Sequence, residues 1–274
     1  MLSGMAFPPP LIAVGVVVTA GLVVLAVASS LAIQRRIVFF PEVLDEDAQL
    51  SFSRPHDEVW FDGGGGRRLH AVRFTPEGQR PGRGRAILYL HGNAGSVRSW
   101  GEVGAELVAS HQAVVYVVDY AGYGKSRGAL TEGAILEDVV AVFDAIQRDH
   151  REVIVFGRSI GSGPAVWLAS QRSPLLLILE TPYASLVDLA GRLVPWWPQR
   201  LLAFRFDSEA WMKKVRCPVH ILHGTDDEVI PLASARRLEP LLPAGSSFTI
   251  IPRGRHNDLS TLPEWQAAMA RVLD

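Results

Sequence analysis

Residues 153–163 read Val153-Ile154-Val155-Phe156-Gly157-Arg158-Ser159-Ile160-Gly161-Ser162-Gly163, and a helix-like segment from Pro164 to Gln171 follows at once. A short apolar, β-branched run thus leads directly into Gly-x-Ser-x-Gly. Strand, sharp turn and helix in this order form a nucleophile elbow, in which a serine hydroxyl points out of the sheet edge. The flanking glycines leave room for strand and helix to cross closely. We therefore expect Ser159 to be a nucleophile; the competing interpretation is a glycine-rich loop that only starts a helix.

Strands and helices alternate on both sides of the elbow. This pattern predicts an α/β domain over residues 55–274, with a mainly parallel eight-stranded sheet and helices on both faces. The expected strands are Val59–Phe61, Leu69–Phe74, Ala86–Leu90, Ala113–Val118, Val153–Phe156, Leu175–Leu179, Val219–Leu222 and Phe248–Ile251. The expected helices are Val97–Ser110, Ala134–Arg148, Pro164–Gln171, Ala233–Leu241 and Thr261–Leu273.

Residues 183–214 interrupt this alternation with apolar runs such as Leu193-Val194-Pro195-Trp196-Trp197-Pro198. Three interpretations stand side by side for this insertion: a small cap over the active site, a surface that touches the membrane, or a helix that packs on the domain.

Leu11 to Ile33 is a run of 23 residues without a charge. At about 1.5 Å per residue it is long enough to cross a hydrocarbon core of about 30 Å, so residues 1–36 are predicted to be a single-pass membrane anchor. Residues 37–54 then form a juxtamembrane linker. Arg35-Arg36 directly after the span favour a cytoplasmic catalytic domain. The alternative is a cleaved signal peptide and export, since Ala26-Val27-Ala28 resembles a cleavage site.

Composition limits the other function classes. Lys+Arg number 27 against 28 Asp+Glu, which gives no sign of a nucleic-acid surface. The single cysteine, Cys217, excludes an intrachain disulfide and a cysteine-rich metal site. Gly-Lys-Ser at 124–126 does not make a phosphate loop, because Asp119 stands where that motif needs glycine. We expect neither a cofactor nor a catalytic metal.

An activated serine needs a general base. In hydrolases whose serine lies on a nucleophile elbow, the acid and then the histidine follow the serine along the chain. His220, His223 and His256 follow Ser159, and the first two lie on the strand that should deliver the acid. His256 lies in the loop after the last strand, so it is the predicted base.

The acid that orients this histidine should lie just past the strand Val219–Leu222. Three adjacent acids compete there, Asp226, Asp227 and Glu228, and spacing alone does not separate the two aspartates. Glu180, at the end of the preceding strand, is a further candidate.

The oxyanion needs two hydrogen-bond donors. The backbone N–H of Ile160, directly after the nucleophile, is one, and the loop after the third strand supplies the other. That loop is His91-Gly92-Asn93-Ala94-Gly95-Ser96, and we assign Asn93 as the donor. His91 is expected to brace the loop through a hydrogen bond.

Four motifs together resemble the α/β-hydrolase fold serine hydrolases. They are His91–Gly95, Asp119–Ser126, Gly157–Gly161 and Gly254–Asp258. Over about residues 35–274 the chain looks most like the membrane-anchored bulged-morphology branch, which includes the protein depalmitoylases of the α/β-hydrolase-domain group. The family pattern His-Gly-x-x-Asp-x-x-x-Pro selects Asp227 as the acid, with Pro231 in register. Arg255 departs from the family, which more often has glycine before the histidine.

The resemblance implies a serine hydrolase that cleaves carboxylic esters or thioesters through an acyl-enzyme on Ser159. His256 would act as base, Asp227 would orient it, and Ile160 and Asn93 would hold the oxyanion. The expected partner is a small acyl substrate, and the anchor suits a lipid-like one. The rival functions are a small-peptide serine aminopeptidase of the same fold and a non-catalytic membrane-anchored scaffold.

Overall fold

The computed structural model describes residues 30–79, 84–193, 195–196 and 198–273. The chain divides into two compact units, Met1–Phe39 and Phe40–Asp274. In the first unit residues 30–38 are helical. The predicted span Leu11–Ile33 lies outside the described residues except for its last four. In the described part of the chain, we find no helix with both the length and the apolar character needed to cross a membrane.

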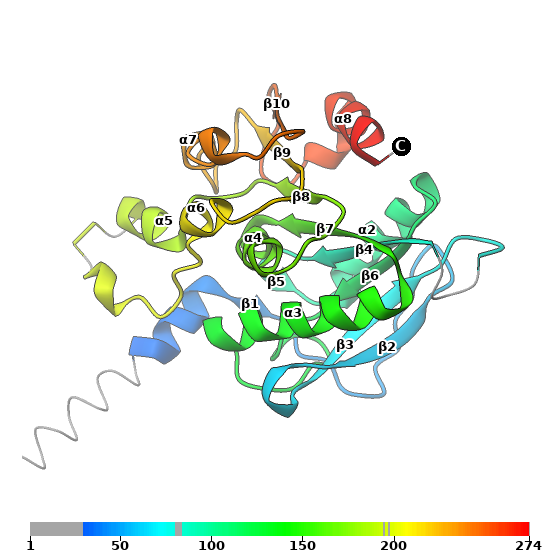
Figure 1. Cartoon of the computed structure of the whole chain (residues 1–274). Coiled ribbons are helices and arrows are strands. Elements are labelled where there is room, and N and C mark those ends of the chain that lie inside the picture. Colours follow the sequence, from blue (N-terminus) through cyan, green and yellow to red (C-terminus); the bar gives the residue numbers. More distant parts are fainter. Residues whose placement is uncertain (1–29, 80–83, 194, 197, 274) are drawn as a thin grey trace, which may run out of the picture. The chain divides into compact units, whose positions relative to one another are not determined.

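Eight strands of the second unit form one sheet in the order β10-β9-β8-β7-β4-β6-β3-β2 (Figure 1). Their bounds are β2 Asp57–Asp62, β3 Arg68–Phe74, β4 Arg85–Leu90, β6 Val114–Val118, β7 Glu152–Arg158, β8 Leu177–Glu180, β9 Val219–Gly224 and β10 Ser247–Ile251. Strand β3 pairs antiparallel with β2 and β6, and the other neighbours pair parallel. The predicted eight-stranded, mainly parallel sheet is confirmed. Its parallel strands end at one common edge, where the predicted site residues follow them.

Helices cover both faces of this sheet, as predicted. The helices are α2 Val97–Ser110, α3 Glu132–Asp149, α4 Ser162–Gln171, α5 Leu186–Leu193, α6 Ser208–Met212, α7 Leu232–Ala235 and α8 Pro263–Leu273. One apolar core joins α2 and α8 to the sheet through side chains such as Leu107, Met269 and Tyr89. Figure 1 shows α3 and α4 crossing the opposite face. Strands β4 and β6 are apolar along almost their whole length, as expected for central strands whose two faces are both covered by helices.

The predicted helix Ala233–Leu241 is wrong in extent. Helix α7 ends at Ala235, and a separate 3₁₀ turn covers Glu239–Leu241. From Arg237 to Glu239 each backbone N–H donates to the carbonyl three residues back, and Pro240, which has no N–H, cannot make the bond to the carbonyl of Arg236 that a continuous α-helix would need. The last helix likewise starts at Pro263, two residues later than predicted, with proline in the first helical position.

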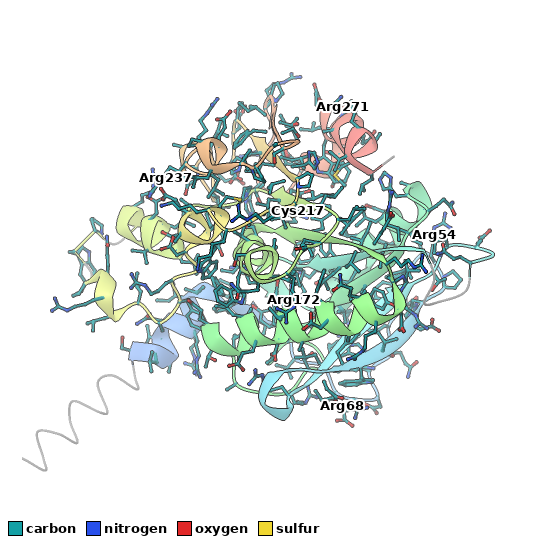
Figure 2. The ribbon with its side chains drawn as sticks, viewed as in Figure 1. Arg54, Arg68, Arg172, Cys217, Arg237 and Arg271 are labelled. Atoms are coloured by element: carbon teal, nitrogen blue, oxygen red, sulfur yellow. The ribbon has the colours of Figure 1, made fainter. Side chains whose placement is uncertain are left out.

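The insertion at 183–214 packs its second half into the domain. Phe206 and Met212 are fully buried, and Trp211 of α6 meets Trp167 of α4 edge to face with ring centroids 5.2 Å apart. This half of the insertion therefore packs on α4, and the proposed cap role of the insertion stays a prediction. Cys217, labelled in Figure 2, lies buried just beyond it, and burial raises the pKa of its thiol to about 11.

The second unit begins earlier than the predicted boundary at residue 55. Strand β1, Phe40–Pro41, pairs in parallel with β5, Ala94–Gly95, inside the loop after β4. The N–H of Glu42 donates to the carbonyl of Gly95 at 2.9 Å. The predicted linker from Phe40 on is therefore part of the second unit, and the extended backbone near its start supplies hydrogen-bond donors to that loop.

Candidate active site

The elbow places Ser159 in a conformation that few residues other than glycine adopt. Strand β7 ends at Arg158, Ser159 has φ +53°, and α4 begins at Ser162. A side chain at Gly157 would lie 2.7 Å from the carbonyl oxygen of Gly161, and one at Gly161 would lie 2.2 Å from that of Leu90. The two motif glycines are thus required by the close approach of strand, turn and helix. The strained turn holds the serine at the carboxyl edge of the sheet.

His256 reaches this serine from the loop after β10. Its Nε2 lies 3.0 Å from Oγ of Ser159. The histidine is buried, and Ser159 is half-buried. A hydroxyl at hydrogen-bond distance from a ring nitrogen can pass its proton to that nitrogen as the hydroxyl attacks.

Asp227 holds the other side of the ring. Nδ1 of His256 lies 2.9 and 3.1 Å from the two carboxylate oxygens, and the backbone N–H groups of Val229 and Ile230 donate to Oδ1 at 2.9 and 2.8 Å. Burial works to raise the pKa of this carboxyl, but the bonds from His256 and the two N–H groups outweigh it, and the pKa is lowered. Asp227 is therefore held as the carboxylate, the form that fixes Nδ1–H and leaves Nε2 to accept.

The competing acids do not contact the His256 ring. Asp226 is exposed and accepts from the hydroxyl of Thr225, and Glu228 is exposed and accepts from the backbone N–H of His256 at 3.4 Å. Glu180 is buried and forms an ion pair with Arg158, with Nε to Oε1 at 3.0 Å. Of the four candidates, Asp227 is the carboxylate in contact with the His256 ring.

The loop after β4 lies beside Ser159. A side chain at Gly92 would stand 3.8 Å from Cβ of Ser159, which places the peptide of Asn93 next to the elbow. His91 is buried, and its Nδ1 donates to the carbonyl of Gly92 at 2.7 Å. This is the bracing expected of His91. The roles of Asn93 and Ile160 as oxyanion donors stay predictions.

Two buried tyrosines, which the sequence did not single out, contact the main-chain carbonyls of the two residues that carry the predicted donors. The hydroxyl of Tyr183 donates to the carbonyl of Ile160 at 3.0 Å, and that of Tyr123 donates to the carbonyl of Asn93 at 2.6 Å. Tyr123 lies in the motif Asp119–Ser126, so its motif position was the available signal. Tyr183 follows β8 at the start of the insertion, and no sequence pattern marks it.

Comparisons with known proteins agree with this architecture. Residues 85–206 match the family model described as alpha/beta hydrolase fold. The chain is 28% identical over 254 residues to the uncharacterized protein Rv2307c of Mycobacterium tuberculosis, covering 91% of this chain and 88% of that protein. It is 28% identical over 269 residues to the alpha/beta hydrolase domain-containing protein WAV2 of Arabidopsis thaliana, covering 87% and 86%.

Among solved structures, the chain is similar to the Pyrococcus furiosus esterase Pf2001. The TM-score is 0.68 at 15% identity, over 86% of this chain and 96% of that one. Likeness at this identity shows the fold alone. The α/β-hydrolase fold predicted from the sequence is confirmed, and it is a fold that known hydrolases share.

Proposed function

We propose that this protein is a serine hydrolase that cleaves carboxylic ester or thioester bonds through an acyl-enzyme on Ser159. The observation that carries the proposal is the unbroken chain of contacts from the Ser159 hydroxyl through the His256 ring to the Asp227 carboxylate. A serine with a base in reach and a third group that orients the base is the arrangement that activates a hydroxyl for acyl transfer.

In the first half-reaction, Oγ of Ser159 attacks the acyl carbon while Nε2 of His256 takes the hydroxyl proton. The carbonyl oxygen becomes an oxyanion, which the N–H groups of Ile160 and Asn93 would stabilise. Each such donor is typically worth about 3–4 kcal/mol in the transition state. When the bond to the leaving group breaks, His256 returns its proton to the leaving alcohol or thiol.

In the second half-reaction, water replaces the leaving group. His256 takes a proton from the water as its oxygen attacks the acyl carbon. The bond to Oγ then breaks, the proton passes to Ser159, and the carboxylic acid is released. Asp227 stays ionised throughout and stabilises the imidazolium in both halves.

The experiment is a hydrolysis assay of the purified full-length chain on p-nitrophenyl esters and acyl thioesters of increasing acyl length. We expect turnover of at least one series by the wild type and none above background by Ser159→Ala. Turnover that persists in a folded Ser159→Ala protein would overturn the elbow assignment.

We also propose that residues 11–33 anchor the domain to the membrane with the catalytic unit on the cytoplasmic side, and that the substrate is a lipid-like or lipidated acyl compound. The run of 23 uncharged residues, followed by Arg35-Arg36, supports this. Retention of the full chain, but not of a variant lacking residues 1–34, in carbonate-washed membranes is the expected result. Release of both chains would contradict the anchor.

A further inference from the structure

Arg158, the residue directly before the proposed nucleophile, is a largely buried cation at the end of β7. Its side chain is 12% exposed. Its Nη2 donates to the main-chain carbonyl of His256 at 3.3 Å and to Oδ1 of Asn257 at 3.4 Å. These contacts cross 98 residues of sequence and join the elbow to the loop that carries the base. They hold the backbone of that loop and leave the imidazole free to move protons.

The guanidinium is itself fixed in place by Glu180. Arg158 and Glu180 are direct partners in the parallel register of β7 and β8, and their ion pair is 3.0 Å long. The second carboxylate oxygen of Glu180 accepts from the indole N–H of Trp265 in α8 at 2.8 Å. Burial acts to lower the pKa of Arg158, but Glu180 and Tyr89 reverse this, and the pKa is raised. The cation therefore stays charged in a protein interior.

A cation–π contact also links Arg158 to the helix that follows the loop after β4. Its guanidinium carbon lies 4.9 Å from the ring centroid of Trp100, within the range of a cation–π interaction. The indole N–H of Trp100 donates to the carbonyl of Ala94 at 2.7 Å, and its ring stacks on His91 with 15° between the planes. Arg158 thus lies where the segments bearing nucleophile, base and predicted oxyanion donor meet.

We propose that Arg158 is a positioning residue, which sets the alignment of the His256 loop and the oxyanion loop on Ser159, and that Glu180 and Trp265 orient it. The inference rests on the proposed hydrolase function. Arg158 touches no reacting atom; it acts through the His256 main chain and through Trp100. A displacement of about 1 Å in a catalytic group can lower a rate by about 100-fold, so the alignment should show in kcat.

The test uses the full chain and four variants. Arg158→Gln alone would leave Glu180 buried without its cation, so the double variant Arg158→Gln/Glu180→Gln removes both charges together. Arg158→Lys keeps the charge but loses the planar fork of donors. Arg172→Gln is the matched control, because Arg172 (Figure 2) forms a bidentate ion pair with Asp144 on the surface, with N–O distances of 2.7 and 2.8 Å. A fourth variant, Glu180→Gln, keeps Arg158 and removes its anchor.

Hydrolysis of p-nitrophenyl butyrate is measured per active serine, with the serine counted by fluorophosphonate labelling run to completion. We expect the double variant to lose about 10- to 100-fold in kcat with KM nearly unchanged, Arg158→Lys and Glu180→Gln to fall between it and wild type, and Arg172→Gln to match wild type. Thermal melting of each variant is recorded beside the rates.

A double variant with wild-type kcat per labelled serine would overturn the positioning role, whether or not its melting temperature falls. A residue that only supports the fold changes the number of active molecules and leaves the rate of each one unchanged. A wild-type protein that neither labels nor turns over substrate is a different result. It would overturn the proposed function itself and, with it, the inference.

Discussion

Nε2 of His256 lies 3.0 Å from Oγ of Ser159, although 97 residues separate the two in the chain. The serine follows β7 and the histidine follows β10, so the contact depends on two intervening strands, β8 and β9, running parallel to both. In such a sheet the carboxyl ends share one edge, and the loops that follow them can converge there.

Removal of either partner should abolish hydrolysis and leave the fold intact. For Ser159→Ala and for His256→Ala we expect kcat to fall by about 10⁴- to 10⁶-fold, because members of such a triad act as one unit. Ester hydrolysis and far-ultraviolet circular dichroism measure the two effects. A folded His256→Ala protein with near wild-type turnover would exclude His256 as the base.

The left-handed backbone of Ser159 makes a stability prediction. Its φ of +53° costs a residue with a side chain about 1–2 kcal/mol, a cost that glycine does not bear. Ser159→Gly should therefore unfold with a free energy about 1 kcal/mol higher than Ser159→Ala, although both are inactive. Urea denaturation compares the pair. Equal midpoints would show that the turn is not strained.

The ionisation of Asp227 should make the free energy of unfolding depend on pH in the acid range. Its pKa is lowered in the folded state, so its contribution is fully present well above the ordinary aspartate pKa of about 3.9 and is lost as pH falls through the folded-state value. The difference in unfolding free energy between wild type and Asp227→Asn should hold steady above about pH 5 and shrink in more acidic buffer. Urea titrations at several pH values measure it, and a difference that grows on acidification has the wrong sign.

Gly161, two residues after Ser159, offers a matched pair with Gly133. A Cβ at Gly161 would lie 2.2 Å from the Leu90 carbonyl oxygen, whereas one at Gly133 in α3 meets nothing within 4 Å. Gly161→Ala should cost about 3 kcal/mol or more, and Gly133→Ala should stabilise by about 0.5–1 kcal/mol. Thermal melting of both variants tests this, and a tolerated Gly161→Ala would contradict the close crossing of strand, turn and helix.

Strand β1 should contribute to the rate of hydrolysis. The N–H of Phe40 donates to the carbonyl of Asn93 at 3.0 Å, and the carboxylate of Glu42 accepts from the hydroxyl of Ser96 at 2.7 Å. A chain that starts at residue 35 should keep the wild-type kcat per labelled serine, while one that starts at residue 45 should lose about tenfold or more, because the loop after β4 loses these bonds. Equal rates for the two chains would show that β1 does not support the loop.

Much of this architecture could be predicted from local patterns. The strands around Ser159 are short apolar runs between turn residues, and the chain order of acid and histidine pointed to His256. Spacing did not separate Asp227 from Asp226; the family pattern did, and the structure places Asp227 against the ring. Glu180 shows what local pattern misses, because its pairing with Arg158 depends on the β7–β8 register. Pro240 was visible in the sequence, but the change to 3₁₀ hydrogen bonding already begins at Arg237, where no residue type marks it.

Activation of Ser159 by His256 should make this serine react with an electrophilic probe. The decisive measurement is fluorophosphonate labelling of the purified full-length protein, followed by mass spectrometry of the modified peptide. We predict labelling at Ser159 in the wild type and its loss in His256→Ala. A well-folded wild type that does not label, or a His256→Ala variant that labels as well as the wild type, would exclude this activation.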